Sequence, residues 1–139
     1  MFNIIPATDE DVAVWVEFDK HIAQSELLIK ISLNRCFILK DNEYIIGVMR
    51  YNMFWDNIPF LTMIFIAGAH QGKGFGKQAL HHWENEMRAK GFACVMTSTR
   101  SDEDAQFFYR KLGYKDSGCL LLDIPALKQP AEIFFIKQL

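Results

Sequence analysis

A short run of glycine, lysine and glutamine residues is the part of the sequence whose residue types and spacing most suggest a functional site. It reads His70-Gln71-Gly72-Lys73-Gly74-Phe75-Gly76-Lys77 and lies between a segment expected to be a strand and one expected to be a helix. Glycine lets a backbone approach a ligand without a Cβ in the way, and helix N-termini carry unpaired amides and partial positive charge. The run therefore predicts a phosphate-binding loop, to which Lys73 and Lys77 add positive charge.

Two common phosphate motifs do not fit this run. A Walker A loop needs Gly-x-x-x-x-Gly-Lys-Ser/Thr, but the stretch from Gly72 to Lys77 is one residue short, and Gln78 replaces the hydroxyl that binds magnesium. A dinucleotide fingerprint needs Gly-x-Gly-x-x-Gly, but Gly76 comes one residue too early and Lys77 stands at the place of the last glycine. Taken alone, the run also fits a helix-opening turn that only needs flexible residues.

A third pattern, Gln/Arg-x-x-Gly-x-Gly/Ala, is met by Gln71, Gly74 and Gly76. About thirty residues later, the stretch Ala105–Tyr114 contains an alanine, then Phe-Tyr, then Lys-x-Gly-aromatic. At this separation the two patterns resemble the two signatures of the GNAT superfamily of acyl-CoA-dependent N-acyltransferases. The expected order of strands and helices is similar to that family over essentially the whole chain.

The resemblance implies a role for each residue that matches the family's motifs. The co-substrate would be acetyl-CoA, and backbone groups of Ile64 and Ile66 would pair with its pantetheine arm as an added strand does. Tyr109 would lie near the thioester sulfur and protonate the departing thiolate, since a phenol donates a proton and a neutral sulfur leaves more easily. The backbone amides that would hold the pyrophosphate belong to Gln71, Gly72, Lys73, Gly74, Phe75, Gly76 and Lys77.

Asp102 departs from the family's pattern. Family members often have asparagine three residues before the alanine of the second motif, in contact with the cofactor. A carboxylate only accepts hydrogen bonds, and it would repel a nearby phosphate. We therefore expect Asp102 to contact a pantetheine amide or to serve the N-terminus of the following helix.

The resemblance further implies direct transfer of an acetyl group from acetyl-CoA to a primary amine, without a metal. No spacing singles out the base that deprotonates the amine. Glu26, Asp56 and Glu103 are candidates, although a solvated charge or a helix cap explains each of them better, since most carboxylates are exposed. Two functions of other classes remain open: a CoA-binding regulatory module without turnover, and a protein that binds a nucleotide phosphate.

The acceptor amine, on a small molecule or a peptide, is expected near the second helix and the loop Asn52–Pro59. Phe54 and Trp55 in that loop would line the acceptor pocket or belong to the core. The apolar run Ile133–Ile136 near the C-terminus suggests pairing across a homodimer.

Hydrophobic periodicity and helix-boundary residues predict the elements that must position these groups. Strands are expected at Phe2–Pro6, Cys36–Lys40, Tyr44–Tyr51, Phe60–Ala67, Phe92–Thr99, Cys119–Ile124 and Glu132–Lys137. Helices are expected from the capping box Thr8-x-x-Asp11 to Lys20, over Ile22–Ile31, from the glycine loop to Lys90, and from a second capping box, Ser101-x-x-Asp104, to Gly113.

The strand Phe60–Ala67 is apolar on both faces, which predicts a central, buried strand. The helix after the glycine loop has one apolar face, made of Ala79, Leu80, Trp83 and Met87. The resemblance adds the architecture: an α/β (α+β) fold with a GNAT-like mixed, mostly antiparallel central sheet flanked by helices, in a single domain over residues 1–139.

The bulk composition is compatible with this fold. The chain has 139 residues, of which 50% are hydrophobic and 14% aromatic, enough for one packed core. A net charge of −2 argues against a nucleic-acid partner, and the sequence shows neither a signal peptide nor an apolar run long enough for a membrane span. Cys36, Cys94 and Cys119 are scattered, so we expect neither disulfides nor zinc, and a cytoplasmic location.

Overall fold

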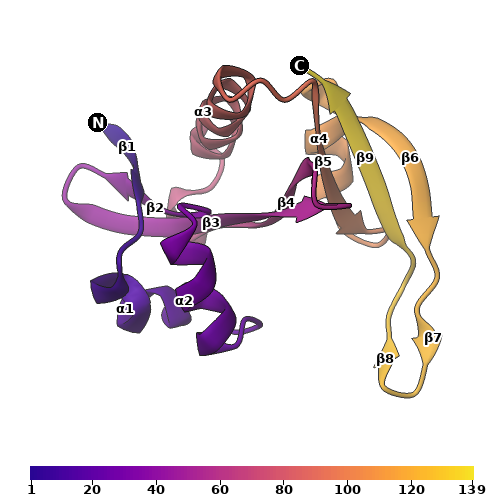
Figure 1. Ribbon diagram of the computed structural model, residues 1–139, viewed down its shortest axis with the longest axis horizontal. Coiled ribbons are helices and arrows are strands. Elements are labelled where there is room, and N and C mark those ends of the chain that lie inside the picture. The colour runs from indigo at the N-terminus through magenta and orange to yellow at the C-terminus, as the bar shows by residue number, and fades with distance from the viewer. The chain divides into compact units, whose positions relative to one another are not determined.

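The computed structural model describes residues 1–139 and shows an α/β fold whose mostly antiparallel sheet has seven strands (Figure 1). Its helices are α1 (Val12–Phe18), α2 (Gln24–Ser32), α3 (Phe75–Ala89) and α4 (Ala105–Lys111), with short 3-10 turns η1 (Asp9–Asp11) and η2 (Gly68–His70). Its strands are β1 (Phe2–Pro6), β2 (Cys36–Asp41), β3 (Tyr44–Phe54), β4 (Ile58–Ile66), β5 (Cys94–Arg100), β6 (Lys115–Leu120), β7 (Asp123–Ile124), β8 (Leu127–Lys128) and β9 (Glu132–Gln138). None of the helices combines the length and the apolar composition that crossing a membrane requires.

Two compact units make up the chain. The first unit comprises Met1–Asn52 and Leu61–Glu86, and the second comprises Met53–Phe60 and Met87–Leu139. Strand order is β1-β2-β3-β4 in the first unit and β5-β9-β6 in the second, which also carries the small β7–β8 hairpin.

Helices cover both faces of β2 and β3 in the first unit (Figure 1). Strand alternation sends Cys36, Ile38 and Val48 to the face where Trp15 of α1 and Leu27 of α2 form a buried cluster with them. On the other face, Tyr51 lies against Trp83 of α3, with ring centroids 5.8 Å apart. The predicted apolar face of α3 is confirmed, because Ala79, Leu80, Trp83 and Met87 are all fully buried.

A buried ion pair fixes the end of α1 against β3. The Asp19 carboxylate, which is 1% exposed, accepts hydrogen bonds from Arg50 Nε at 2.7 Å and Trp15 Nε1 at 3.1 Å. Burial alone would raise the pKa of Asp19, but the hydrogen bonds from Arg50 and Trp15 and the charge of Arg50 together hold it below its ordinary value.

Replacing Asp19 with asparagine is expected to lower the free energy of unfolding by about 3 kcal/mol, because Arg50 would stay buried without its charge partner. Urea unfolding at pH 7 measures this change, with Asp123→Asn as the control; Asp123 pairs with Lys128 on the surface and should matter little. The folded-state pKa of Asp19 is lowered, so the pair's contribution is present above the ordinary value of 3.8 and is lost as pH falls through the folded-state pKa. Equal effects of the two substitutions at pH 7 would contradict this role.

The second unit places α4 against one face of its strands. Thr97 on β5 lies opposite Phe135 on β9, and Phe135 packs against Tyr109 of α4 with ring centroids 5.9 Å apart. The neighbouring pairs, Met96 with Ile136 and Ser98 with Phe134, point to the opposite face because side chains alternate along a strand.

Both glycines predicted to end helices do so. Gly91 follows α3 with a φ of 90°, and Gly113 follows α4 with a φ of 92°. Residues other than glycine rarely adopt such positive φ angles. The capping box of Thr8 and Asp11 is also present at η1. The second predicted capping box is wrong: Asp104 is the N-cap of α4, and the Gln106 amide instead donates to the carbonyls of Ser101 and Glu103.

Three other predictions need correction. The stretch Asn52–Pro59 is not a loop, because β3 and β4 extend into it and a tight turn joins them at Trp55 and Asp56. The strand β4 is not buried on both faces, since Phe65 is 41% exposed. The run Ile133–Ile136 lies in β9, whose two edges pair with β5 and β6, so it has no free edge for pairing across a dimer.

Candidate functional site

The glycine run forms a tight loop between η2 and α3, as its position in the sequence predicts. Gly72 and Gly74 have φ angles of 74° and 84°, in the left-handed region that glycine adopts without steric cost. The carbonyl of Gly74 accepts the hydrogen bond from the Gln78 amide at 3.1 Å. The amides of Phe75, Gly76 and Lys77 therefore belong to the first turn of α3, where a helix offers its own amides no partner.

The surface above this loop has room for an anion. A Cβ built on Gly72 or on Gly74 would meet no atom within 4 Å, so the required φ, and not crowding, is what selects glycine at these positions. Lys73 and Lys77 are exposed beside the loop and carry positive charge. A pyrophosphate fits this place because it can accept hydrogen bonds from the unpaired amides. The partial positive charge of the helix start and the two lysines would also attract it.

Aromatic stacking anchors the start of α3 in the first unit. The Phe75 ring stacks on Phe2 of β1, with centroids 4.8 Å apart and planes 15° from parallel. His70 lies at the other end of the loop, and its buried Nδ1 has no hydrogen-bond partner. The loop is therefore held at its helical end by packing, while a polar atom at its strand end is left for another group.

Ile64 and Ile66 lie half-buried in the last part of β4. The carbonyl oxygen of Ile66 accepts a hydrogen bond from the Gln71 side-chain amide at 2.7 Å. A carbonyl oxygen has two lone pairs, so this one hydrogen bond does not by itself saturate it. Gln71 thus closes the loop back onto β4 through its side chain, a contact that its place in the motif does not reveal.

Tyr109 lies in the middle of α4 and is 5% exposed. Its ring packs against Phe108, Tyr114 and Phe135, with centroids 5.3 to 5.9 Å away. Burial raises the pKa of the Tyr109 phenol, and a hydrogen bond with Thr97 opposes that rise only in part. A phenol with a raised pKa keeps its proton at neutral pH, which an acid requires.

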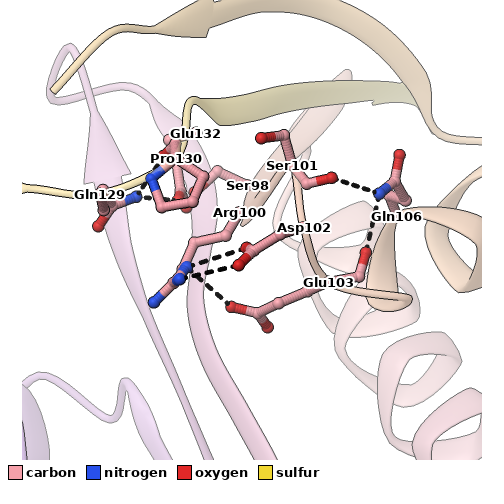
Figure 2. A network of polar contacts seen from close by, with 9 residues as sticks. All are labelled: Ser98, Arg100, Ser101, Asp102, Glu103, Gln106, Gln129, Pro130 and Glu132. Atoms are coloured by element: carbon pink, nitrogen blue, oxygen red, sulfur yellow. Dashed lines mark hydrogen bonds and ion pairs between the residues drawn. The ribbon is translucent and has the colours of Figure 1, made fainter.

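Asp102 is engaged with Arg100, as Figure 2 shows. The guanidinium of Arg100 binds both carboxylate oxygens of Asp102, with its Nε at 3.1 Å and its Nη2 at 2.9 Å. These hydrogen bonds and the charge of Arg100 lower the pKa of Asp102. Neutralisation by Arg100 reduces the repulsion of phosphate that the sequence alone suggests, while the half-exposed carboxylate keeps further lone pairs for an amide donor.

The three candidate bases are all on the surface. Glu26 is exposed on α2, and Asp56 is exposed in the β3–β4 turn. Glu103 is exposed and forms an ion pair with Arg100 at 3.7 Å.

Sequence reasoning missed Glu132, the first residue of β9. Its carboxylate is partly buried and accepts hydrogen bonds from Ser98 Oγ at 2.7 Å and from Gln129 Nε2 at 2.9 Å (Figure 2). Only the pairing of β5 with β9 brings Ser98 to Glu132, which is 34 residues away in the sequence. No local spacing carries this signal.

The structure thus gathers the predicted residues in two groups. The loop residues and the end of β4 lie together in the first unit, and Tyr109 and Asp102 belong to the second. Phe54 and Trp55, predicted for an acceptor pocket or the core, line a cavity within the second unit.

The sequence pattern of the acetyltransferase (GNAT) family matches residues 6–114 of the chain. No curated protein sequence matches it. Among solved structures, a GNAT-family acetyltransferase from Bacillus cereus ATCC 10987 is 23% identical, with a TM-score of 0.78 over 99% of this chain and 97% of that one.

Two further structures share the fold. A GNAT-family acetyltransferase from Elizabethkingia anophelis with acetyl-CoA bound is 16% identical, with a TM-score of 0.79 over 99% of this chain and 98% of that one. Ard1 from Thermoplasma volcanium is 12% identical, with a TM-score of 0.85 over 99% of this chain and 97% of that one.

Proposed function

The chain belongs to the GNAT acetyltransferase family, and on that basis we propose that it transfers an acetyl group from acetyl-CoA to a primary amine by direct attack. The observation that carries this proposal is the loop before α3, in which two glycines with positive φ precede the free amides of a helix start. The neighbouring structure from E. anophelis holds acetyl-CoA, which supports the same co-substrate here. The whole chain, residues 1–139, would act as one acetyltransferase domain in the cytoplasm.

In this proposal the loop residues Gln71 to Lys77 bind the pyrophosphate through backbone amides, and Lys73 and Lys77 add charge. Backbone groups of Ile64 and Ile66 pair with the pantetheine arm, and the bond from Gln71 to the Ile66 carbonyl ties the loop to this end of β4. Asp102, already paired with Arg100, accepts a hydrogen bond from a pantetheine amide. Acetyl-CoA supplies the activated acyl group, and these contacts orient it.

Tyr109 acts as the general acid. The deprotonated amine attacks the thioester carbonyl carbon, a C–N bond forms and the C–S bond breaks, and the leaving thiolate takes the phenolic proton. Burial favours the neutral phenol, and the hydroxyl of Thr97 orients it. The nitrogen loses one proton to solvent as the amide forms, and solvent returns one proton to the Tyr109 phenolate. The number of protons is therefore conserved.

Release of free CoA thiol tests this function. With acetyl-CoA and a panel of primary amines, we expect thiol release that depends on both substrates, and an acetylated amine as the second product, seen by mass spectrometry. If acetyl-CoA binds but no amine on the panel causes thiol release above hydrolysis, the chain is a CoA-binding module without turnover.

Calorimetry separates acetyl-CoA from a nucleotide. The loop lacks the hydroxyl that a Walker A motif uses for magnesium, because Gln78 stands in its place. We expect acetyl-CoA to bind at least about 10-fold more tightly than MgATP, since pantetheine adds contacts that ATP lacks. Tighter binding of MgATP would contradict the assignment of the loop to CoA.

A further inference from the structure

A hollow lies on the face of β5, β9 and β6 opposite α4. Its volume is about 570 Å³, which suits a small ligand. The register places Met96, Phe134 and Ile136 on this face. The tip of the β3–β4 hairpin, which belongs to the same unit, adds Phe54 and Trp55, and β6 adds Leu120.

The hollow is lined by large apolar side chains that are exposed, although such side chains are usually buried. Trp55 is 78% exposed and Leu120 is 47% exposed. Trp55 also has a φ of 52°, a conformation that a bulky residue rarely adopts, within a turn closed by the Asn57 amide on the Phe54 carbonyl at 3.2 Å. An exposed apolar surface held in a costly conformation is typical of a binding site.

One end of this face carries the carboxylate of Glu132. Glu132 lies two residues from Phe134, on the same face of β9. In the pairing of β9 with β6, Glu132 lies opposite Leu120, and Leu120 and Phe134 both line the hollow. Ser98 and Gln129 each donate one hydrogen bond to it, to different oxygens (Figure 2). A carboxylate has about four acceptor positions, so roughly two remain for a further donor.

The charges around Glu132 favour a cation. Arg100, which lies opposite Glu132 in the register, is the neighbouring positive group, and its guanidinium is bound to Asp102 and paired with Glu103. The guanidinium nearest to Glu132 in the register is thus already paired with two other carboxylates. An ammonium group at Glu132 would complement that excess of negative charge.

The same strand links this carboxylate to the proposed acid. Thr97 and Ser98 are consecutive in β5 and point to opposite faces. Thr97 hydrogen-bonds Tyr109 on the α4 face, and Ser98 hydrogen-bonds Glu132 on the other. Two consecutive residues of β5 thus hydrogen-bond the proposed acid and this carboxylate.

We propose that this hollow is the acceptor site and that the acceptor is a primary amine carrying an aromatic-sized apolar group, with its ammonium bound to Glu132. The inference rests on the proposed acetyltransferase function. An apolar cavity of about 150 Å³ already holds a benzene molecule, so the volume of the hollow accommodates such a group. The acceptor's ring would pack between Trp55, Leu120 and Phe134.

Steady-state kinetics with 2-phenylethylamine and ethanolamine tests this inference. Wild-type protein is expected to show a kcat/KM for 2-phenylethylamine at least about 10-fold above that for ethanolamine, since the ring adds apolar burial. Trp55→Ala should raise the KM for 2-phenylethylamine about 10-fold and leave ethanolamine nearly unchanged. Glu132→Gln should raise the KM for both amines roughly 30-fold, because both lose the charged partner of the ammonium.

Matched controls come from the hairpin of β2 and β3, at its turn and the start of β3. Tyr44→Ala removes an aromatic side chain that is 73% exposed, and Glu43→Gln removes an exposed carboxylate, both outside the hollow. Neither should alter either KM by more than about twofold. Thermal unfolding of all four variants checks that each remains folded.

Acetylation of any amine supports the proposed function, and the ranking of amines decides the inference. A preference for ethanolamine, or equal effects of Trp55→Ala on both amines, would overturn it. If sedimentation shows a dimer that Trp55→Ala dissociates, a second copy of the chain covers the hollow, and the inference is wrong.

Should no amine turn over, fluorescence gives a direct answer. Trp15 and Trp83 are fully buried, so Trp55 is the exposed reporter. A saturable change on adding 2-phenylethylamine in the presence of CoA, abolished by Glu132→Gln, supports the site, and no change rejects it.

Discussion

Gly74→Ala is expected to weaken acetyl-CoA binding about 100-fold. Gly74 has a φ of 84°, and an alanine held there costs roughly 1–2 kcal/mol. Without ligand the altered loop would relax to a negative φ, turning its amides away from the phosphate, and losing one charge-assisted hydrogen bond costs about 1.5 kcal/mol more. Calorimetric titration with acetyl-CoA measures the dissociation constant.

Gly68→Ala is the matched control for this experiment. Gly68 lies in η2, does not have a positive φ, and a Cβ there would meet no atom within 4 Å. This variant should bind acetyl-CoA within about twofold of the wild type. If Gly74→Ala behaves like Gly68→Ala, the conformation of the loop does not serve phosphate binding.

Tyr109→Phe is expected to lower kcat about 100-fold while acetyl-CoA binding stays the same. The phenylalanine ring keeps the packing against Phe108 and Phe135, so the variant loses the acid and one hydrogen bond with Thr97, worth about 1 kcal/mol of stability. Tyr114→Phe, another buried tyrosine of the same cluster, should leave kcat within about twofold. Equal kcat values for the two variants would remove Tyr109 from the mechanism.

The pH dependence of kcat provides a second readout of Tyr109. An acid works only while it holds its proton, and burial raises the pKa of Tyr109 above its ordinary value of 10.0. Loss of kcat from deprotonation of Tyr109 should therefore be centred above pH 10.0. An alkaline loss centred near neutral pH in the wild type, absent from Tyr109→Phe, would contradict the raised pKa.

Local signals explain why much of the fold follows from the sequence. The apolar face of α3 repeats at helical spacing, and Gly91 and Gly113 mark helix ends because the chain there needs a positive φ. The family resemblance, carried by Gln71, Gly74 and Tyr109, supplies the order of the elements and the mostly antiparallel sheet.

Contacts between distant segments, and local bends that no residue pattern marks, explain what the sequence does not reveal. The last strand, β9, inserts between β5 and β6, and this order gives Glu132 its partner Ser98. The turn at Trp55 and Asp56 lacks the Asn-Gly pair that usually marks two residues with positive φ, so a loop is the natural prediction there. The Arg100–Asp102 pair likewise depends on the bend after β5 and not on motif spacing.

Amide hydrogen exchange of the loop reports pyrophosphate binding directly, because the proposed ligands of the pyrophosphate are the backbone amides before and within the first turn of α3. Saturating acetyl-CoA is predicted to slow exchange at the amides of Gly72 to Lys77, while pantetheine, which lacks the pyrophosphate, leaves them unchanged. Unaltered exchange at these amides with acetyl-CoA bound would show that the loop does not hold the pyrophosphate.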